Sequence, residues 1–74
     1  MKITVKLFAS FRTGRFDVET TDYPPGTTVA AVAELLRLST AELGIMICNH
    51  RHVKLDYELT EGDILALFPL LGGG

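Results

Sequence analysis

The segment at residues 64–68, Ile-Leu-Ala-Leu-Phe, is apolar on both faces. An alternating strand needs cover on one face only, but a continuous apolar strand needs cover on both and belongs in the middle of a sheet. Residues 3–8, ITVKLF, alternate and predict a half-buried strand in which Phe8 falls on the polar side. If these strands are central neighbours, they must run parallel, because a helix and later segments form the crossover between them.

The chain between these two strands carries the signals of a hairpin and a helix. A turn at residues 12–15 and renewed alternation at 16–20 predict a second strand, which the two prolines of residues 23–26 end. Residues 29–38, VAAVAELLRL, place apolar side chains at i, i+3, i+4 and i+7, after Thr28 as N-cap. We therefore expect one helix with its apolar stripe against the sheet.

The remaining segments are short. Residues 39–42 have the S-x-x-E spacing of a capping box, but Gly44 leaves room for only about one helical turn. We expect a third strand at 45–48, a turn at 49–52 and a short fourth strand at 53–55. This order predicts an α+β fold, a ubiquitin-like β-grasp with a mixed sheet of four to five strands packed on one main helix.

Length and composition limit the class of protein. Seventy-four residues make one domain, which we divide into a β-grasp body at 1–69 and a flexible tail at 70–74. The net charge of −2 gives no concentration of Lys and Arg for a nucleic-acid partner. No signal peptide or membrane span is apparent, so we expect a cytoplasmic protein without membrane contact. No catalytic triad or phosphate-binding loop stands out, so we expect no enzyme by itself.

Two further groups of residues have plain explanations. Cys48 lies in an apolar run, and we expect a small core residue rather than a reactive thiol. His50 and His52 lack an acidic or cysteine neighbour at ligand spacing, so we expect a solvated turn and no metal. An acidic cluster should make the region around the tail negative, either as plain surface or to steer a basic partner; its members are Asp56, Glu58, Glu61 and Asp63.

Four motifs resemble the MoaD/ThiS family of ubiquitin-like sulfur carriers over essentially the whole chain. They are LFASFR at 7–12, GTTV at 26–29, LTEGD at 59–63 and FPLLGGG at 68–74. The chain is more similar to the small subunit of molybdopterin synthase than to the thiazole-synthesis carrier. It departs from the molybdopterin pattern at Leu70 and Gly72, where a second proline and a non-glycine residue are usual, so the pathway stays open.

The resemblance implies chemistry at the terminal carboxylate of Gly74. A carboxylate is a poor electrophile at cellular pH. In this family an E1-like adenylating enzyme activates it with ATP, sulfur displaces AMP, and the resulting thiocarboxylate donates sulfur. The chain itself would bind no cofactor. Glycines let the tail enter a narrow channel and present an unhindered carbonyl, while two leucines offset the ordering cost. The tail residues concerned are Leu70, Leu71, Gly72 and Gly73.

The resemblance also implies a docking surface. Phe8, Arg12 and Phe68 occupy positions that contact the large synthase subunit in the molybdopterin branch; a thiazole synthase-type acceptor is the alternative partner. Phe8 and Phe68 should share one face of the sheet if their strands pair in that register. The competing interpretations are sheet packing for the two phenylalanines and a solvated loop residue for Arg12.

Three classes of function remain open. The favoured one is a sulfur carrier for molybdopterin or tungstopterin synthesis, with thiamin thiazole or another sulfur-transfer pathway as the alternative. A non-catalytic β-grasp interaction module is the second, and a ubiquitin-like modifier joined to lysines through Gly74 is the third. Removing Gly74 should abolish the first and third functions but not the second.

Overall fold

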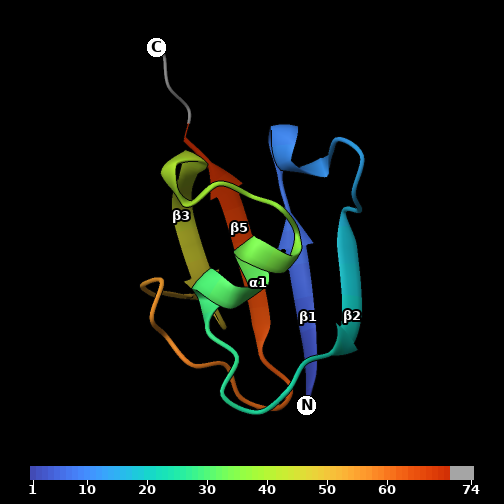
Figure 1. The fold of residues 1–74 in the computed structure, drawn as a ribbon, viewed down its shortest axis with the longest axis vertical. Coiled ribbons are helices and arrows are strands. Elements are labelled where there is room, and N and C mark those ends of the chain that lie inside the picture. Colours follow the sequence, from blue (N-terminus) through green and yellow to red (C-terminus); the bar gives the residue numbers. More distant parts are fainter. Residues whose placement is uncertain (71–74) are drawn as a thin grey trace.

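The computed structural model describes residues 1–70 and shows, within them, a five-stranded mixed sheet with one α-helix on one face (Figure 1). The strand order is β2-β1-β5-β3-β4, with β1 and β5 parallel and the other neighbours antiparallel. This arrangement confirms the predicted β-grasp fold. The elements are β1 (Lys2–Leu7), η1 (Ala9–Arg12), β2 (Val18–Asp22), α1 (Val29–Leu35), η2 (Thr40–Glu42), β3 (Leu43–Cys48), β4 (Arg51–His52) and β5 (Ile64–Pro69).

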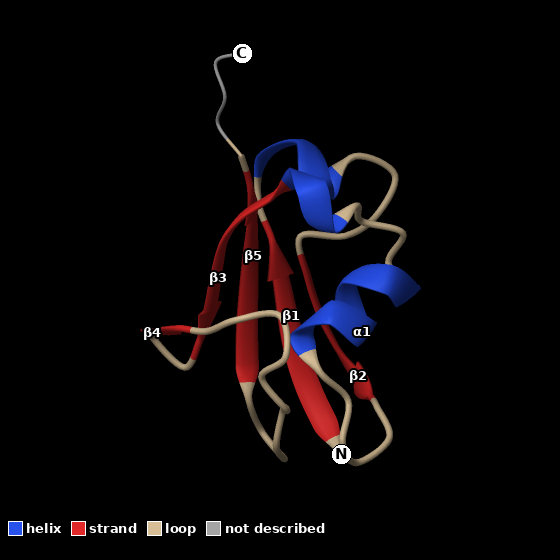
Figure 2. Cartoon of the chain, turned by 60° about the vertical axis from the view of Figure 1, so that its left-hand side comes forward, coloured by secondary structure: helices blue, strands red, loops and turns tan. Residues whose placement is uncertain are grey.

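Strand β5 lies in the middle of the sheet, as its continuous apolar run predicts. Leu65 and Leu67 are fully buried on the face that carries α1, whereas Ala66 and Phe68 are half-buried on the other face. We call this other face, which α1 leaves uncovered, the open face. Both 3-10 helices, η1 and η2, lie at the end of the sheet from which β5 leaves (Figure 2).

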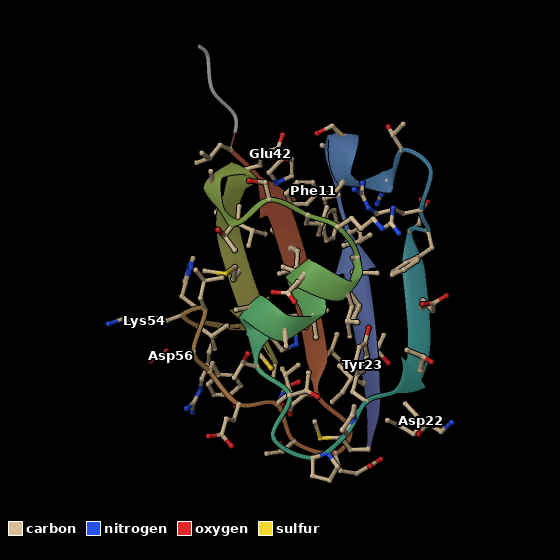
Figure 3. The ribbon with its side chains drawn as sticks, viewed as in Figure 1. Phe11, Asp22, Tyr23, Glu42, Lys54 and Asp56 are labelled. Atoms are coloured by element: carbon tan, nitrogen blue, oxygen red, sulfur yellow. The ribbon has the colours of Figure 1, made fainter. Side chains whose placement is uncertain are left out.

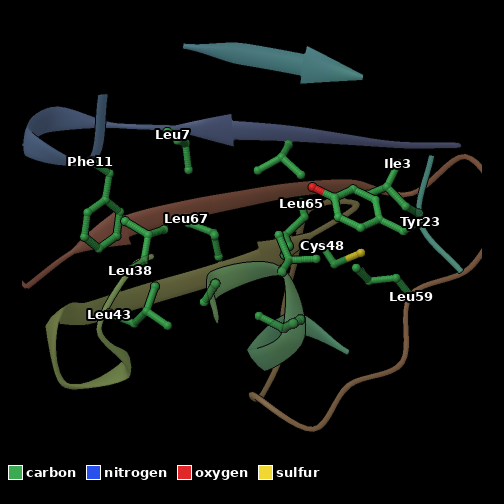
Figure 4. Packing of buried hydrophobic residues seen from close by; sticks show 14 residues of the cluster. Ile3, Leu7, Phe11, Tyr23, Leu38, Leu43, Cys48, Leu59, Leu65 and Leu67 are labelled. Atoms are coloured by element: carbon green, nitrogen blue, oxygen red, sulfur yellow. The ribbon is translucent and has the colours of Figure 1, made fainter. Parts of the chain in front are cut away.

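The core fills the space between α1 and the sheet (Figure 4). Thr28 caps the helix as predicted, because its hydroxyl oxygen accepts a hydrogen bond from the Ala31 N–H at 3.1 Å. The helix ends at Leu35 rather than continuing to Leu38. Arg37 takes a left-handed backbone conformation with φ of 59°, and the chain turns so that Leu38 enters the core instead.

The short fourth strand is Arg51–His52, and the expectation of a strand at 53–55 was wrong. Asn49 and His50 both have positive φ, 51° and 71°, which makes a tight turn, so pairing with β3 resumes at once. Val53 and Leu55 instead pack against the core. The 3-10 helix η1 was also not predicted; it begins directly after Phe8, where only a later turn was expected.

The acidic cluster lies at the opposite end of the sheet from Leu70, the root of the tail, so the expectation of a negative region there was wrong. The loop that contains Asp56 precedes β5, and the strand then runs the length of the sheet before it ends at Pro69 (Figures 1 and 3). Asp63 is not on the surface at all but 5% exposed, and the Glu61 carboxylate accepts a hydrogen bond from the Lys2 N–H.

Candidate functional site

The rings of Phe8 and Phe68 stack on the open face. Leu7 pairs with Leu67 in the parallel β1–β5 ladder, so the residues that follow them lie side by side. The ring centroids are 4.2 Å apart and the ring planes differ by 9°. Both residues are half-buried. The expectation that Phe8 and Phe68 share one face is therefore confirmed, and the sheet presents a single aromatic surface near the end of β5.

Arg12 is held against this aromatic pair by the turn of η1. Its Nε donates a hydrogen bond to the Leu7 carbonyl at 2.7 Å, and its guanidinium carbon lies 5.2 Å from the centroid of the Phe8 ring. Asp17 approaches the same Nε at 3.6 Å. Arg12 is therefore a positioned cation over an aromatic ring rather than a freely solvated loop residue.

An apolar hollow of about 470 Å³ adjoins the aromatic pair at the end of β5. A second hollow of about 340 Å³ continues along the open face toward Lys6 and His50. Large apolar side chains remain accessible in the first hollow, since Ile45 is 43% exposed and Leu70 is 60% exposed. The first hollow is lined by Phe8, Ala9, Gly44, Ile45, Phe68, Pro69 and Leu70. Such a concave apolar surface is typical of a protein-docking site.

Sequence reasoning missed the β3 side of this hollow. Gly44 and Ile45 contribute to its lining, but the third strand was expected to begin only at 45. The signal that could have found the site is the isolated glycine next to an apolar strand, which often marks a bulge or a close backbone approach. The ladder between β3 and β5 does shift register between Leu43 and Ile45.

The tail begins at the rim of the hollow. The Leu70 N–H donates a hydrogen bond to the Glu42 carbonyl at 2.8 Å, directly after β5. The predicted reactive residue Gly74 lies outside the described residues, as do Leu71, Gly72 and Gly73. Their roles, and the proposed boundary between body and tail, stay predictions.

Cys48 is a core residue, as predicted. Cys48 is only 2% exposed. Burial is the larger cause and the nearby charge of Asp63 the next, and together they raise the pKa of the thiol to about 11. A thiol with so high a pKa carries little thiolate at neutral pH and is a poor nucleophile.

No group of three or more His, Cys, Asp or Glu side chains in residues 1–70 could hold a metal ion. In the same part of the chain, no helix is long and apolar enough to cross a bilayer. His50 and His52 lie in the tight turn and in β4, respectively, and both are exposed.

Comparison with known proteins identifies similar chains. The model of the ThiS family matches residues 5–74. A solved structure described as molybdopterin converting factor, subunit 1, from Pyrococcus furiosus is 30% identical, with a TM-score of 0.74. The match covers 93% of this chain and 97% of that chain. A search of curated proteins found no match.

Two more distant solved structures share the fold. Small archaeal modifier protein 1 from Haloferax volcanii is 22% identical with a TM-score of 0.72, over 92% of this chain and 95% of that one. A chain from the complex of subunits 1 and 2 of the molybdopterin-converting factor of Helicobacter pylori is 16% identical with a TM-score of 0.66. That match covers 100% of both chains. At these identities the likeness extends to the fold alone.

Proposed function

The chain belongs to the ThiS family, and on that premise we propose that the carboxylate of Gly74 carries sulfur for molybdopterin or tungstopterin synthesis. ThiS/MoaD-like proteins are small ubiquitin-fold sulfur carriers or modifiers and act as carriers rather than catalysts. The choice of pathway rests on one observation: the Pyrococcus furiosus protein that matches nearly the whole chain is described as a molybdopterin converting factor subunit.

The proposed cycle has three steps. A carboxylate oxygen of Gly74 attacks the α-phosphate of ATP in an E1-like adenylating enzyme, and pyrophosphate leaves. Sulfide (HS⁻) from the sulfur source then attacks the carbonyl carbon and AMP leaves with one carboxylate oxygen, which gives a thiocarboxylate with that oxygen replaced by sulfur and releases a proton. Finally the sulfur passes to the acceptor, and oxygen from water restores the carboxylate.

In this cycle the described residues bind the partner protein and take no part in the chemistry. We propose that Phe8, Arg12 and Phe68 bind the partner while the tail enters its active site. Four residues follow Leu70 in the sequence and reach at most about 14 Å when extended. The body must therefore dock close to the mouth of the partner's channel, and the apolar hollow lies at that end of the sheet. The complex of two subunits from Helicobacter pylori supports a large synthase subunit as one such partner.

Intact-mass measurement tests the carrier chemistry. The full-length protein is incubated with ATP, a sulfur source and an extract of its own cells, beside a variant that lacks Gly74. We expect a mass gain equal to the exchange of one oxygen for sulfur, localised to Gly74 and absent from the variant. An unchanged mass in an active extract would contradict the proposal.

The choice of pathway needs a second measurement. Thiocarboxylated protein is mixed either with a molybdopterin synthase large subunit and its precursor or with a thiazole synthase and its substrates. We expect sulfur transfer only in the first mixture. Transfer only in the second would assign the chain to thiamin thiazole synthesis, with the carrier chemistry unchanged.

Protein modification is the second candidate, and the shared fold with small archaeal modifier protein 1 is the observation that raises it. A carboxyl adenylate can be captured by a lysine amine as well as by sulfur. Conjugates on cellular proteins that depend on Gly74 would favour modification. An interaction module without terminal chemistry would instead keep its function when Gly74 is removed.

A further inference from the structure

The root of the tail is held by backbone contacts from the segment before β3. In the β3–β5 ladder Leu43 pairs with Pro69 and Ile45 pairs with Phe68, so Gly44 is the extra residue of a bulge. One residue beyond the strand, the Leu70 N–H donates to the Glu42 carbonyl at 2.8 Å. Figure 3 shows Glu42 at the end of the sheet where β5 leaves.

Gly44 has no room for a side chain. A Cβ atom at this position would lie 2.8 Å from the Pro69 carbonyl oxygen and 3.0 Å from both the Cα and the N of Leu70. All three atoms belong to backbone and cannot rotate away as a side chain could. Glycines with positive φ do occur in this chain, as at Gly26, but Gly44 is not among them. Glycine is therefore required at position 44 for close approach rather than for its backbone conformation.

We propose that Gly44 is a positioning residue, which together with the Glu42 carbonyl clamps residues 69 and 70 and fixes where the reactive tail leaves the body. This inference rests on the proposed function. With the clamp closed, residues 69 and 70 are held against the segment before β3. With the clamp open, residues 69 and 70 also become free, and a partner must order them when it binds the tail.

Substitution Gly44→Ala in the full-length protein should open the clamp, and Gly26→Ala is the matched control. Gly26, unlike Gly44, has a left-handed backbone conformation with φ of 87°, and nothing lies within 4 Å of a Cβ placed there. The control therefore strains the chain before α1 without touching the tail. We expect amide hydrogen exchange at Leu70 to accelerate at least about tenfold relative to amides in the middle of β5 in Gly44→Ala only.

Steady-state kinetics of ATP-dependent activation provide the second measurement. With the E1-like enzyme from the same cells, Gly44→Ala should raise KM for the carrier about tenfold and leave kcat nearly unchanged, because only the cost of ordering the tail has changed. Gly26→Ala should lower the melting temperature without raising KM. A general loss of stability would affect both variants alike.

The outcomes separate the clamp from the proposed function. Normal Leu70 protection in Gly44→Ala, or an unprotected Leu70 amide in the wild type, would overturn the clamp; the wild-type measurement decides even if the variant fails to fold. Faster exchange with an unchanged KM would overturn its positioning role. If the wild type is never activated by ATP, the proposed function falls and the positioning role with it, whereas the exchange data still report on the contact itself.

Discussion

Phe8 and Phe68 stack nearly parallel, with centroids 4.2 Å apart, on the face of the sheet that α1 leaves uncovered. Stacked rings in a core are expected from burial alone, but these two are only half-buried and border an apolar hollow. Ring stacking fixes both side chains in one arrangement before any partner arrives. A prearranged aromatic surface loses little side-chain entropy on binding, which is the property of an interaction hot spot.

Substitution Phe68→Ala should weaken binding to the molybdopterin synthase large subunit by at least about tenfold, because truncating a central aromatic residue removes most of its buried contact. Leu35→Ala is the control, since Leu35 lies on α1, on the opposite side of the sheet, and is 66% exposed. Isothermal titration calorimetry measures both affinities. Equal losses for the two variants would argue against a docking site centred on the aromatic pair.

The position of this aromatic pair could be predicted from the sequence, and its surroundings could not. The continuous apolar run at 64–68 is typical of a central strand, and parallel pairing with the first strand then brings Phe8 next to Phe68. The register follows from the side-chain alternation, which is a local pattern.

The contacts that complete the site depend on segments far apart in the sequence. Gly44 is needed because the backbone at Pro69 and Leu70 passes close to it. An isolated glycine beside an apolar strand can indicate such an approach, but it does not identify which distant segment makes it. Arg12 resembles any loop arginine until η1 turns its guanidinium back over the Phe8 ring. Asp63 lies in a run of acidic residues that resembles plain surface, yet its side chain is buried and accepts a hydrogen bond from the turn that precedes it.

Asp63 makes the fold sensitive to acid. Its carboxylate accepts hydrogen bonds from the Thr60 N–H at 2.8 Å, the Thr60 hydroxyl at 3.2 Å and the Asn49 side-chain amide at 2.8 Å. Burial by itself would raise the pKa of Asp63, but these bonds favour the ionised form, and the pKa lies below its ordinary value of 3.8. The ionised carboxylate therefore stabilises the fold above the pKa of the unfolded chain, and this contribution is lost as pH falls through the folded pKa.

We expect the free energy of unfolding of the wild type to fall below about pH 4. Asp63→Asn should lose about 1–3 kcal/mol at pH 7, because the amide cannot accept all three hydrogen bonds. The difference between variant and wild type should then shrink in acid. Urea denaturation at pH 7 and pH 3 measures this, with the exposed Asp56→Asn as control. A difference that is the same at both pH values would contradict the assignment.

The turn between β3 and β4 carries avoidable strain. The side chain of Asn49 stabilises its left-handed backbone conformation, because it accepts a hydrogen bond from the Ile64 N–H and donates one to Asp63. His50, with φ of 71°, has no such hydrogen bond among the described residues. Glycine adopts this conformation without steric cost, so His50→Gly should raise the free energy of unfolding by about 0.5 kcal/mol after the added entropy of the unfolded chain.

Urea denaturation of His50→Gly and His52→Gly separates relief of strain from loss of a side chain. His52 lies in β4, where a glycine should weaken pairing with β3. We therefore expect the two substitutions to act in opposite directions. A loss of stability in His50→Gly as large as that in His52→Gly would show that the histidine side chain contributes more than its backbone conformation costs.

Arg15 connects η1, which follows Phe8, to the C-terminal end of α1. Its guanidinium donates hydrogen bonds to the carbonyls of Leu36 at 2.8 Å, Phe11 at 3.1 Å and Arg37 at 3.2 Å, and thereby joins η1 to the C-terminal end of α1. A cation at a helix C-terminus also interacts favourably with the free carbonyls there. Lysine keeps the charge but lacks the planar fork that reaches several carbonyls at once.

Arg15→Lys should therefore destabilise the fold by about 1 kcal/mol, which corresponds to about 5 °C in Tm for a domain of this size. Arg37→Lys is the control, because only its backbone carbonyl takes part in this contact. Since η1 begins directly after Phe8, loosening η1 should also weaken binding of the large subunit, but less than Phe68→Ala does. If Arg15→Lys melts at the wild-type temperature, the charge alone accounts for the contact and the fork geometry does not matter.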